Sequence, residues 1–336
     1  MIVAIRPVVG YHYSDGSFNI IEGTWRREAR VRLTKALRQG AHGMGRRALR
    51  KQLIQAIETG DLTRVAEIAA ADPTIVNAAN SHGHVPLGAA IGTGRLKRVK
   101  ALLALGADPR YAYHGRSLLD AAAYGGHVEI FRYLVSLGAQ PTVHHAAASG
   151  DIALLEEMLT ANPALRGPTP AGGRWRITPL HAAVLGGSRA AIAYLLAQDM
   201  PIDAVNHNGH TALALCAEHP TANTRVSMAQ VLLEHGANAN TSGGHHGGTV
   251  LHRAVIHGDA ALAQALLEHG AAPNCQDWSG KTPLHHAVAK NRQLVALLLS
   301  YAPNCAVQSR DGETPVQYAR RLQKRAVVRL LEGARA

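Results

Sequence analysis

A short pattern of apolar and polar positions recurs along the second half of the chain. The run Thr-Pro-Leu-His-Ala-Ala begins at Thr178, and closely related runs begin at Thr249 and Thr282. Weaker copies begin at Thr211 and Thr314, so successive threonines are 33, 38, 33 and 32 residues apart. Self-similarity at a period of this length indicates a repeat architecture, in which each repeat is one supersecondary unit.

Each repeat has room for two short helices. In the first of them, the small pair Ala182-Ala183 follows the threonine, a glycine comes at Gly187, and a Leu-Leu pair follows at Leu195-Leu196. Helices shorter than about 12–15 residues are marginal in water, so their apolar faces must be buried against neighbouring repeats. We therefore predict a stack of helix pairs with a thin alanine layer and a thicker leucine layer, in which leucines such as Leu196 and Leu267 are buried.

The pattern resembles the ankyrin repeat, whose period near 33 and T-P-L-H-x-A signature match it. The resemblance extends upstream through Val85-Pro86-Leu87 and Ser117-Leu118-Leu119-Asp120, and includes a shorter, degenerate repeat at about 142–170. It implies an all-α repeat fold, an ankyrin-repeat solenoid of helix-turn-helix units with hairpin fingers. About nine units, caps included, are expected over residues 46–336.

Three segments depart from the repeat. The unit holding Cys216 is four residues longer before its leucine pair, which predicts a bulging loop at 218–223. The finger at 241–248 is rich in glycine and is expected to be mobile in the free protein. The stretch 166–173, rich in Pro and Gly, is expected to be an extended loop.

Residues 1–45 do not match the repeat and are expected to form a separate extension. The polar run 14–17 between aromatic residues indicates a hairpin. Apolar residues at helical spacing from Trp25 to Leu37 then predict a basic amphipathic helix. An alternative is that the native chain starts at Met44, directly before the first cap helix.

The net charge of +12 lies at the two ends of the chain. Residues 1–51 hold 11 basic and 3 acidic side chains, residues 310–336 hold 7 and 3, and residues 52–309 hold 17 of each. A basic balance ordinarily suggests nucleic acid or an anionic surface as a partner. Because an open repeat array needs polar caps to stay soluble, the charged ends are weaker support for such a partner.

Histidine and threonine of the repeat signature are expected to be structural. The threonine can cap the first helix, the proline suits its first turn, and the resemblance implies that the imidazole bonds neighbouring backbone groups. These positions are Thr178, Pro179, His181, Thr249, His252, Thr282, Pro283 and His285. His145 and Asp120 occupy the position of the signature histidine in their own repeats.

Candidate binding residues follow from the resemblance, which implies that finger tips and exposed first-helix positions bind other proteins. Trp175 and Trp278 are the most informative, because a large aromatic side chain in a solvated loop has no role in a core; the alternative is that each packs on its own finger. The full set is Tyr113, Arg116, Tyr124, Arg174, Trp175, Arg176, His207, His210, Arg253, His257, Trp278, Lys281, His286 and Lys290.

Metal and thiol chemistry are not expected. The finger histidines show no recognised ligand spacing, so they are expected to be solvated polar side chains; they are His82, His84, His114, His207, His210, His245 and His246. Cys275 and Cys305 fall at equivalent positions of adjacent repeats, too far apart for a disulfide, and Cys216 is expected in the core.

No catalytic motif is present, and no cofactor is expected. The sequence therefore predicts a non-enzymatic protein-protein interaction module, a monomer without a membrane span, in the cytoplasm; a secreted effector stays open. The alternative function is binding of nucleic acid or anionic surfaces through basic residues at the ends. These residues are Arg26, Arg27, Arg30, Arg46, Arg47, Arg50, Lys51, Arg320, Arg321, Lys324 and Arg325.

Overall fold

A computed structural model describes residues 45–113, 116–166, 176–241 and 247–334. They divide into an N-terminal body that ends at Asp108 and a C-terminal body that begins at Pro109. Within the described residues, helices α2 to α19 form nine consecutive pairs. The all-α repeat fold and the number of units predicted from the sequence are thus confirmed.

The N-terminal body contains two helix pairs. The first pair is α2 (Arg46–Thr59) and α3 (Leu62–Ala71), followed by the 3-10 helix η2 (Pro73–Asn77). The second pair is α4 (Pro86–Gly92) and α5 (Leu96–Ala104). Leu53, Ile75 and Leu87 are buried in the core of this body. The expected boundary near residue 45 stays a prediction, because residues 1–44 lie outside the described part of the chain.

The C-terminal body contains seven pairs, and its first finger is a short antiparallel hairpin. Strand β1 (Ala112–Tyr113) pairs with β2 (Arg116–Ser117), with Tyr113 opposite Arg116. The pairs, in chain order, are α6 (Leu118–Tyr124) with α7 (Val128–Ser136), α8 (Val143–Ser149) with α9 (Ile152–Ala161), α10 (Pro179–Leu185) with α11 (Arg189–Leu196), α12 (Ala212–Cys216) with α13 (Ala222–Glu234), α14 (Val250–His257) with α15 (Ala260–Glu268), α16 (Pro283–Lys290) with α17 (Arg292–Leu299), and α18 (Pro315–Arg321) with α19 (Arg325–Gly333). The 3-10 helix η3 (Pro163–Arg166) follows α9.

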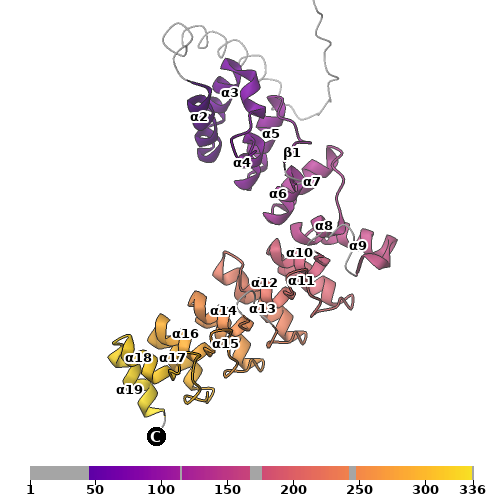
Figure 1. Ribbon diagram of the computed structural model, residues 1–336. Coiled ribbons are helices and arrows are strands. Elements are labelled where there is room, and N and C mark those ends of the chain that lie inside the picture. Colours follow the sequence, from indigo (N-terminus) through magenta and orange to yellow (C-terminus); the bar gives the residue numbers. More distant parts are fainter. Residues whose placement is uncertain (1–44, 114–115, 167–175, 242–246, 335–336) are drawn as a thin grey trace, which may run out of the picture. The chain divides into compact units, whose positions relative to one another are not determined.

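First and second helices of the C-terminal body form two rows. First helices pack on one another from α6 to α12 and again from α14 to α18, and the second helices α13, α15, α17 and α19 contact one another in the same way (Figure 1). Alanines such as Ala183 and Ala287, fully buried, allow the first helices to approach closely. The alanine layer predicted from the sequence is therefore present.

The leucine layer was predicted correctly except at one position. Leu195 and Leu266 are fully buried, and Leu267 is buried as expected. Leu196 is only half-buried, so the expectation that it lies in the core is wrong. In α11 the first leucine of the pair faces the core, and the second lies at the edge of the buried surface.

The longer repeat does not place all its extra residues in a loop. The connection after α12 runs from 217 to 221, and α13 then extends over 13 residues. The predicted bulge at 218–223 is therefore partly wrong, because Ala222 and Asn223 already belong to the second helix. The segments 167–175 and 242–246, which include most of the other two predicted loops, lie outside the described residues.

Candidate functional site

Three signature histidines join their first helix to the finger that follows it. Thr178 caps α10 and donates its backbone N–H to Nδ1 of His181, three residues later, at 3.2 Å. Since Nδ1 accepts this bond, Nε2 carries the proton and donates to the carbonyl of His210, 2.9 Å away. The imidazole thus links the start of one repeat to the finger of the next.

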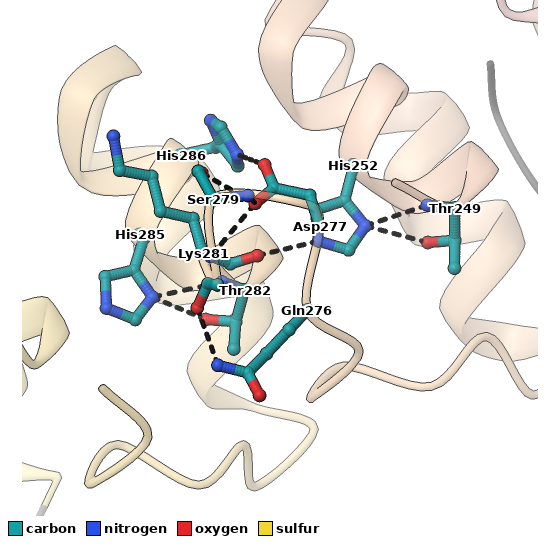
Figure 2. Close-up of polar contacts among 10 residues, drawn as sticks. Thr249, His252, Gln276, Asp277, Ser279, Lys281, Thr282, His285 and His286 are labelled. Carbon is teal, nitrogen blue, oxygen red and sulfur yellow. Dashed lines mark hydrogen bonds and ion pairs between the residues drawn. The ribbon is translucent and has the colours of Figure 1, made fainter. Parts of the chain in front are cut away.

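The same bonds recur in the two repeats that follow the longer one. Thr249 donates its N–H to Nδ1 of His252 at 3.0 Å, and Nε2 of His252 lies 3.1 Å from the carbonyl of Lys281. His285 makes the equivalent contacts at 3.1 and 3.0 Å, with the N–H of its own threonine and with a carbonyl of the following finger. Figure 2 shows both imidazoles with their threonines. In both repeats the imidazole thus bonds backbone groups of its own repeat and of the next finger.

A variant of this link joins α6 to the degenerate repeat. Thr142 donates its N–H to Nδ1 of His145 at 3.1 Å, and Nε2 of His145 lies 2.9 Å from Oδ1 of Asp120. Asp120 stands in the histidine position of its own repeat, where its Oδ2 accepts the N–H of Ser117 at 2.6 Å. His145 thus bonds back to the preceding first helix, whereas Nε2 of the adjacent His144 lies 2.9 Å from the carbonyl of Ile177, the residue before Thr178.

The signature histidines are neutral parts of the scaffold. Burial lowers the pKa of His181, His252 and His285, although the bond to a backbone carbonyl opposes the shift in each case. Each imidazole spans two repeats, because the accepting carbonyl belongs to the residue before the next signature threonine. The fingers are therefore fixed on the helices that precede them.

Asp277 organises the finger between α15 and α16. Its Oδ1 accepts hydrogen bonds from the N–H and Oγ of Ser279, at 2.8 and 2.6 Å, and from the N–H of Lys281 at 3.0 Å. Its Oδ2 lies 2.7 Å from Nε2 of His286 on α16 (Figure 2). Burial opposes ionisation of this carboxyl, but the bonds from Ser279 and His286 lower its pKa to about 2. The carboxylate thus holds the turn together and joins it to α16.

A cavity of about 500 Å³ lies where this finger meets the first helices. Ile256 of α14 and Trp278 of the finger supply its apolar wall, and they are 39% and 62% exposed. His286 and Arg310 supply polar groups. An exposed indole beside an exposed aliphatic side chain is a surface that a partner can cover with a gain of hydrophobic free energy.

Several cations of the fingers and first helices are already paired. Arg253 forms an ion pair with Glu218, and Arg321 forms a two-bonded pair with Glu313, at 2.7 and 2.9 Å. Lys281 and Arg321 both lie over the ring of Tyr318, about 5 Å from its centre. These contacts hold long side chains in place next to the fingers.

Most of the predicted binding positions within the described residues lie at fingers or on first helices. The side chains that are exposed or half-buried at these places are Tyr124, Arg176, His207, Arg253, His257, Trp278, Lys281, His286 and Lys290. Tyr113 and Arg116 are register partners in the β1–β2 hairpin, and Arg174 and Trp175 lie outside the described residues. His210 differs from the expectation, because it is only 5% exposed and its carbonyl accepts the bond from His181.

Sequence reasoning missed Ile256, Asp277 and Arg310. Ile256 comes seven residues after Thr249, a position that is also exposed in the α10 repeat, where Leu185 is 42% exposed. Arg310 precedes Thr314 by four residues, as Trp278 precedes Thr282. Aligning the repeats column by column would have found both residues, whereas the pairing of Asp277 with His286 needs the three-dimensional fold.

The histidines and cysteines form no metal or disulfide site among the described residues. Among these, no group of three or more His, Cys, Asp or Glu side chains could hold a metal ion. His114, His245 and His246 lie outside them. Cys216, Cys275 and Cys305 are free thiols, and burial raises the pKa of Cys216, so its thiol stays protonated.

The fold and this surface define a helical repeat protein with projecting fingers. The chain belongs to the ankyrin repeat family, since the family model for ankyrin repeats (three copies) matches residues 53–144, 143–243, 222–308 and 251–335. No helix in the described part of the chain is long and apolar enough to cross a membrane.

Two relatives share the repeats but are much longer proteins. The chain is 25% identical over 263 residues to the E3 ubiquitin-protein ligase KEG of Arabidopsis thaliana, and the match covers 73% of this chain and 16% of the ligase. It is 26% identical over 274 residues to inversin of Canis lupus familiaris, covering 79% of this chain and 22% of inversin. The chain thus spans less than a quarter of the length of either relative.

A solved structure supports the same fold. The crystal structure of an ankyrin repeat domain from Acinetobacter baumannii AYE matches with a TM-score of 0.51 and 26% sequence identity. The match covers 57% of this chain and 96% of that domain.

Proposed function

We propose that the protein is a non-enzymatic binding module that holds another protein on its finger tips and first helices. The observation that carries this proposal is the exposed pair of Trp278 and Ile256 at a cavity beside the fingers. Tryptophan is enriched among the residues that dominate binding energy, and it is costly to leave in water. A monomer in the cytoplasm is the setting we propose, with a secreted effector as the alternative.

Affinity capture with the intact chain tests this function. A protein retained by the wild type should be lost when Trp175 and Trp278 are both replaced by alanine. The matched control is Gln264→Ala, an exposed position on the second helix α15. Capture that is equal for the wild type and the double variant would contradict a role for the fingers.

Binding of nucleic acid through the basic ends is the second candidate, favoured by the position of the net charge. Several of these cations already serve the fold. Arg50 donates to the carbonyls of Ala78 and His84, at 2.9 and 2.7 Å, and Lys324 donates to the carbonyl of Ala289 at 2.6 Å. These bonds hold the side chains against the backbone, which limits how far they can reach toward phosphate groups.

Salt dependence separates the two candidates. Neutralising phosphates releases counterions, so binding to nucleic acid should weaken steeply between about 50 and 200 mM salt. We expect no such binding by the intact chain at physiological salt. A tight, strongly salt-dependent complex with a nucleic acid would instead favour the second candidate.

A further inference from the structure

The second repeat of the N-terminal body carries a strongly basic helix. The sequence has no acidic residue between Asp72 and Asp108, and the four basic side chains of this stretch all lie at the start of α5. They are Arg95, Lys97, Arg98 and Lys100, and together they are called the basic edge. The equal numbers of basic and acidic side chains over residues 52–309 therefore conceal a local excess of positive charge. Because this repeat is not a cap of the array, the solubility of an open end does not explain the excess.

The basic edge lies on the solvent side of α5. The helix buries Val99 and Leu102 and exposes Arg95, Lys97 and Lys100. Arg95 and Lys97 form no ion pair with any residue that the structure describes. Two exposed positive charges at the start of the helix are therefore available to a ligand.

Arg98 is held against the neighbouring turn, which connects α2 with α3. Its Nη1 donates to the carbonyl of Glu58 at 2.8 Å, and a Cβ atom added to Gly60 would lie 2.9 Å from its Nη2. The guanidinium thus lies along the backbone of the turn and joins the two repeats of this body. Its positive charge is fixed in place next to the exposed cations of the helix.

The carboxylates of the same turn and of α3 leave an excess of positive charge. Oδ1 of Asp61 accepts the N–H of Arg64 at 2.9 Å, and Glu67 forms an ion pair with the side chain of Arg64 at 3.0 Å. Glu58 and Asp61 then place two negative charges next to the four positive charges of the basic edge. A ligand that meets this surface from solvent therefore meets a net positive charge.

We propose that the basic edge is a second binding surface of the protein, and that it takes an acidic segment of a partner protein. Guanidinium groups form short, two-bonded contacts with carboxylates, and complementary charge across an interface speeds association and selects the partner. The basic edge belongs to a second helix, whereas the proposed function uses finger tips and first helices. The inference therefore goes beyond the proposed function.

The composition of the N-terminal body favours a protein segment over other anionic partners. Residues 45–108 contain no Phe, Tyr or Trp, the side chains on which unpaired bases stack. Four cations also fall short of the roughly 6–10 phosphate contacts of a strongly bound duplex. None of the exposed large apolar side chains of the described residues lies in this body, so it lacks the groups that anchor a helix in a membrane surface.

Fluorescence polarisation with labelled peptides tests the basic edge in the full chain, at about 150 mM salt. The probes are a short glutamate-rich peptide and the same peptide with glutamine in place of every glutamate. We expect the glutamate peptide to bind at least tenfold more tightly. The double variant Arg95→Glu with Lys97→Glu should weaken its binding at least tenfold.

Two controls separate the basic edge from folding and from net charge. Arg95 caps α5 and Lys97 lies in its first turn, where the helix dipole favours acidic side chains, so the double variant should unfold in urea at least as late as the wild type. Arg189→Glu with Arg292→Glu changes the net charge equally, at exposed first positions of α11 and α17. This second double variant should have much less effect on the glutamate peptide. Equal weakening by both double variants would overturn the proposal.

Other anionic probes test the choice of partner. A single-stranded oligonucleotide, a DNA duplex or phosphatidylserine vesicles that bind through Arg95 and Lys97 more tightly than the glutamate peptide would overturn a protein partner. The absence of any binding of the glutamate peptide at millimolar concentration would overturn the basic edge itself. Capture through the fingers is measured separately, so the proposed function stands in that case if capture persists. Loss of capture with intact peptide binding would overturn the proposed function alone.

Discussion

Single histidines connect the repeats of this protein, because each one bonds backbone groups on both sides of a repeat boundary. His181 and His285 accept a threonine N–H on one nitrogen and face a carbonyl of the next finger with the other. Protonation would place a proton against the donating N–H and break that bond. The scaffold should therefore be sensitive to acid.

Stability should fall as the pH falls below about 6.5, the usual pKa of histidine in an unfolded chain. Burial lowers the pKa of His181, His252 and His285, so the unfolded chain binds protons before the folded chain does. By linkage, this stabilisation is complete above that pH and is lost as the pH falls toward the folded values. Urea unfolding at a series of pH values between about 5 and 8 measures this loss of stability.

A triple variant supplies the control. Gln317 takes the histidine's place in the last repeat, where its Oε1 accepts the N–H of Thr314 at 2.8 Å. Replacing His181, His252 and His285 with glutamine should reduce the pH dependence between about pH 5 and 7, the range in which unfolded histidines take up protons. It should not abolish it, because burial also lowers the pKa of His127, His144, His219 and His257. An unchanged slope would show that other groups cause it.

Arg176 should be a source of backbone strain. Its φ of 48° lies in the left-handed region, at the finger position where Gly209, Gly280 and Gly312 have φ of 75°, 71° and 73°. Glycine adopts this conformation without a Cβ clash, so Arg176→Gly should stabilise the fold by about 1 kcal/mol. Arg176→Ala keeps the clash and serves as the control in denaturant unfolding. A glycine variant no more stable than the alanine variant would contradict the strain.

At the scale of elements, the short helices gain their stability from the alanine and leucine layers that they bury between them. Helices α10 and α11 have 7 and 8 residues, too few to persist alone. The sequence period predicted the pairs, the alanine layer and the leucine layer. It did not predict that Leu196 would be only half-buried, because that depends on the rotation of the second helix against its neighbours.

Leu195→Ala should lower the free energy of unfolding by about 2–5 kcal/mol, the usual cost of a cavity at a fully buried leucine. Leu195 is completely buried, whereas Leu196 is half-buried. Leu196→Ala, measured by the same urea unfolding, should therefore cost clearly less. A larger effect at Leu196 than at Leu195 would contradict the difference in burial between the two leucines.

The whole molecule combines an array that is neutral by formal charge with basic ends. The positions of the candidate binding residues followed from the repeat frame, since Trp278 and Lys281 lie on a finger as predicted from their place before Thr282. The cavity beside them did not follow from the sequence. Its walls come from three segments far apart along the chain, at Ile256, Trp278 and Arg310.

Deleting residues 1–43 should leave the array folded. The first cap helix α2 begins at Arg46, and its buried residues, Leu53, Ala56 and Ile57, all follow the deletion. Circular dichroism and urea unfolding should give the same cooperative transition as the full chain. Loss of cooperativity would contradict the boundary proposed near residue 45.

Site-specific photo-crosslinking tests the binding face most directly. A photoreactive phenylalanine analogue would replace Trp278 on the finger and, in a second variant, Gln264 on the second helix α15. A captured protein should form adducts from position 278 and not from position 264. Adducts from position 264 alone would contradict the central claim that the fingers and first helices hold the partner.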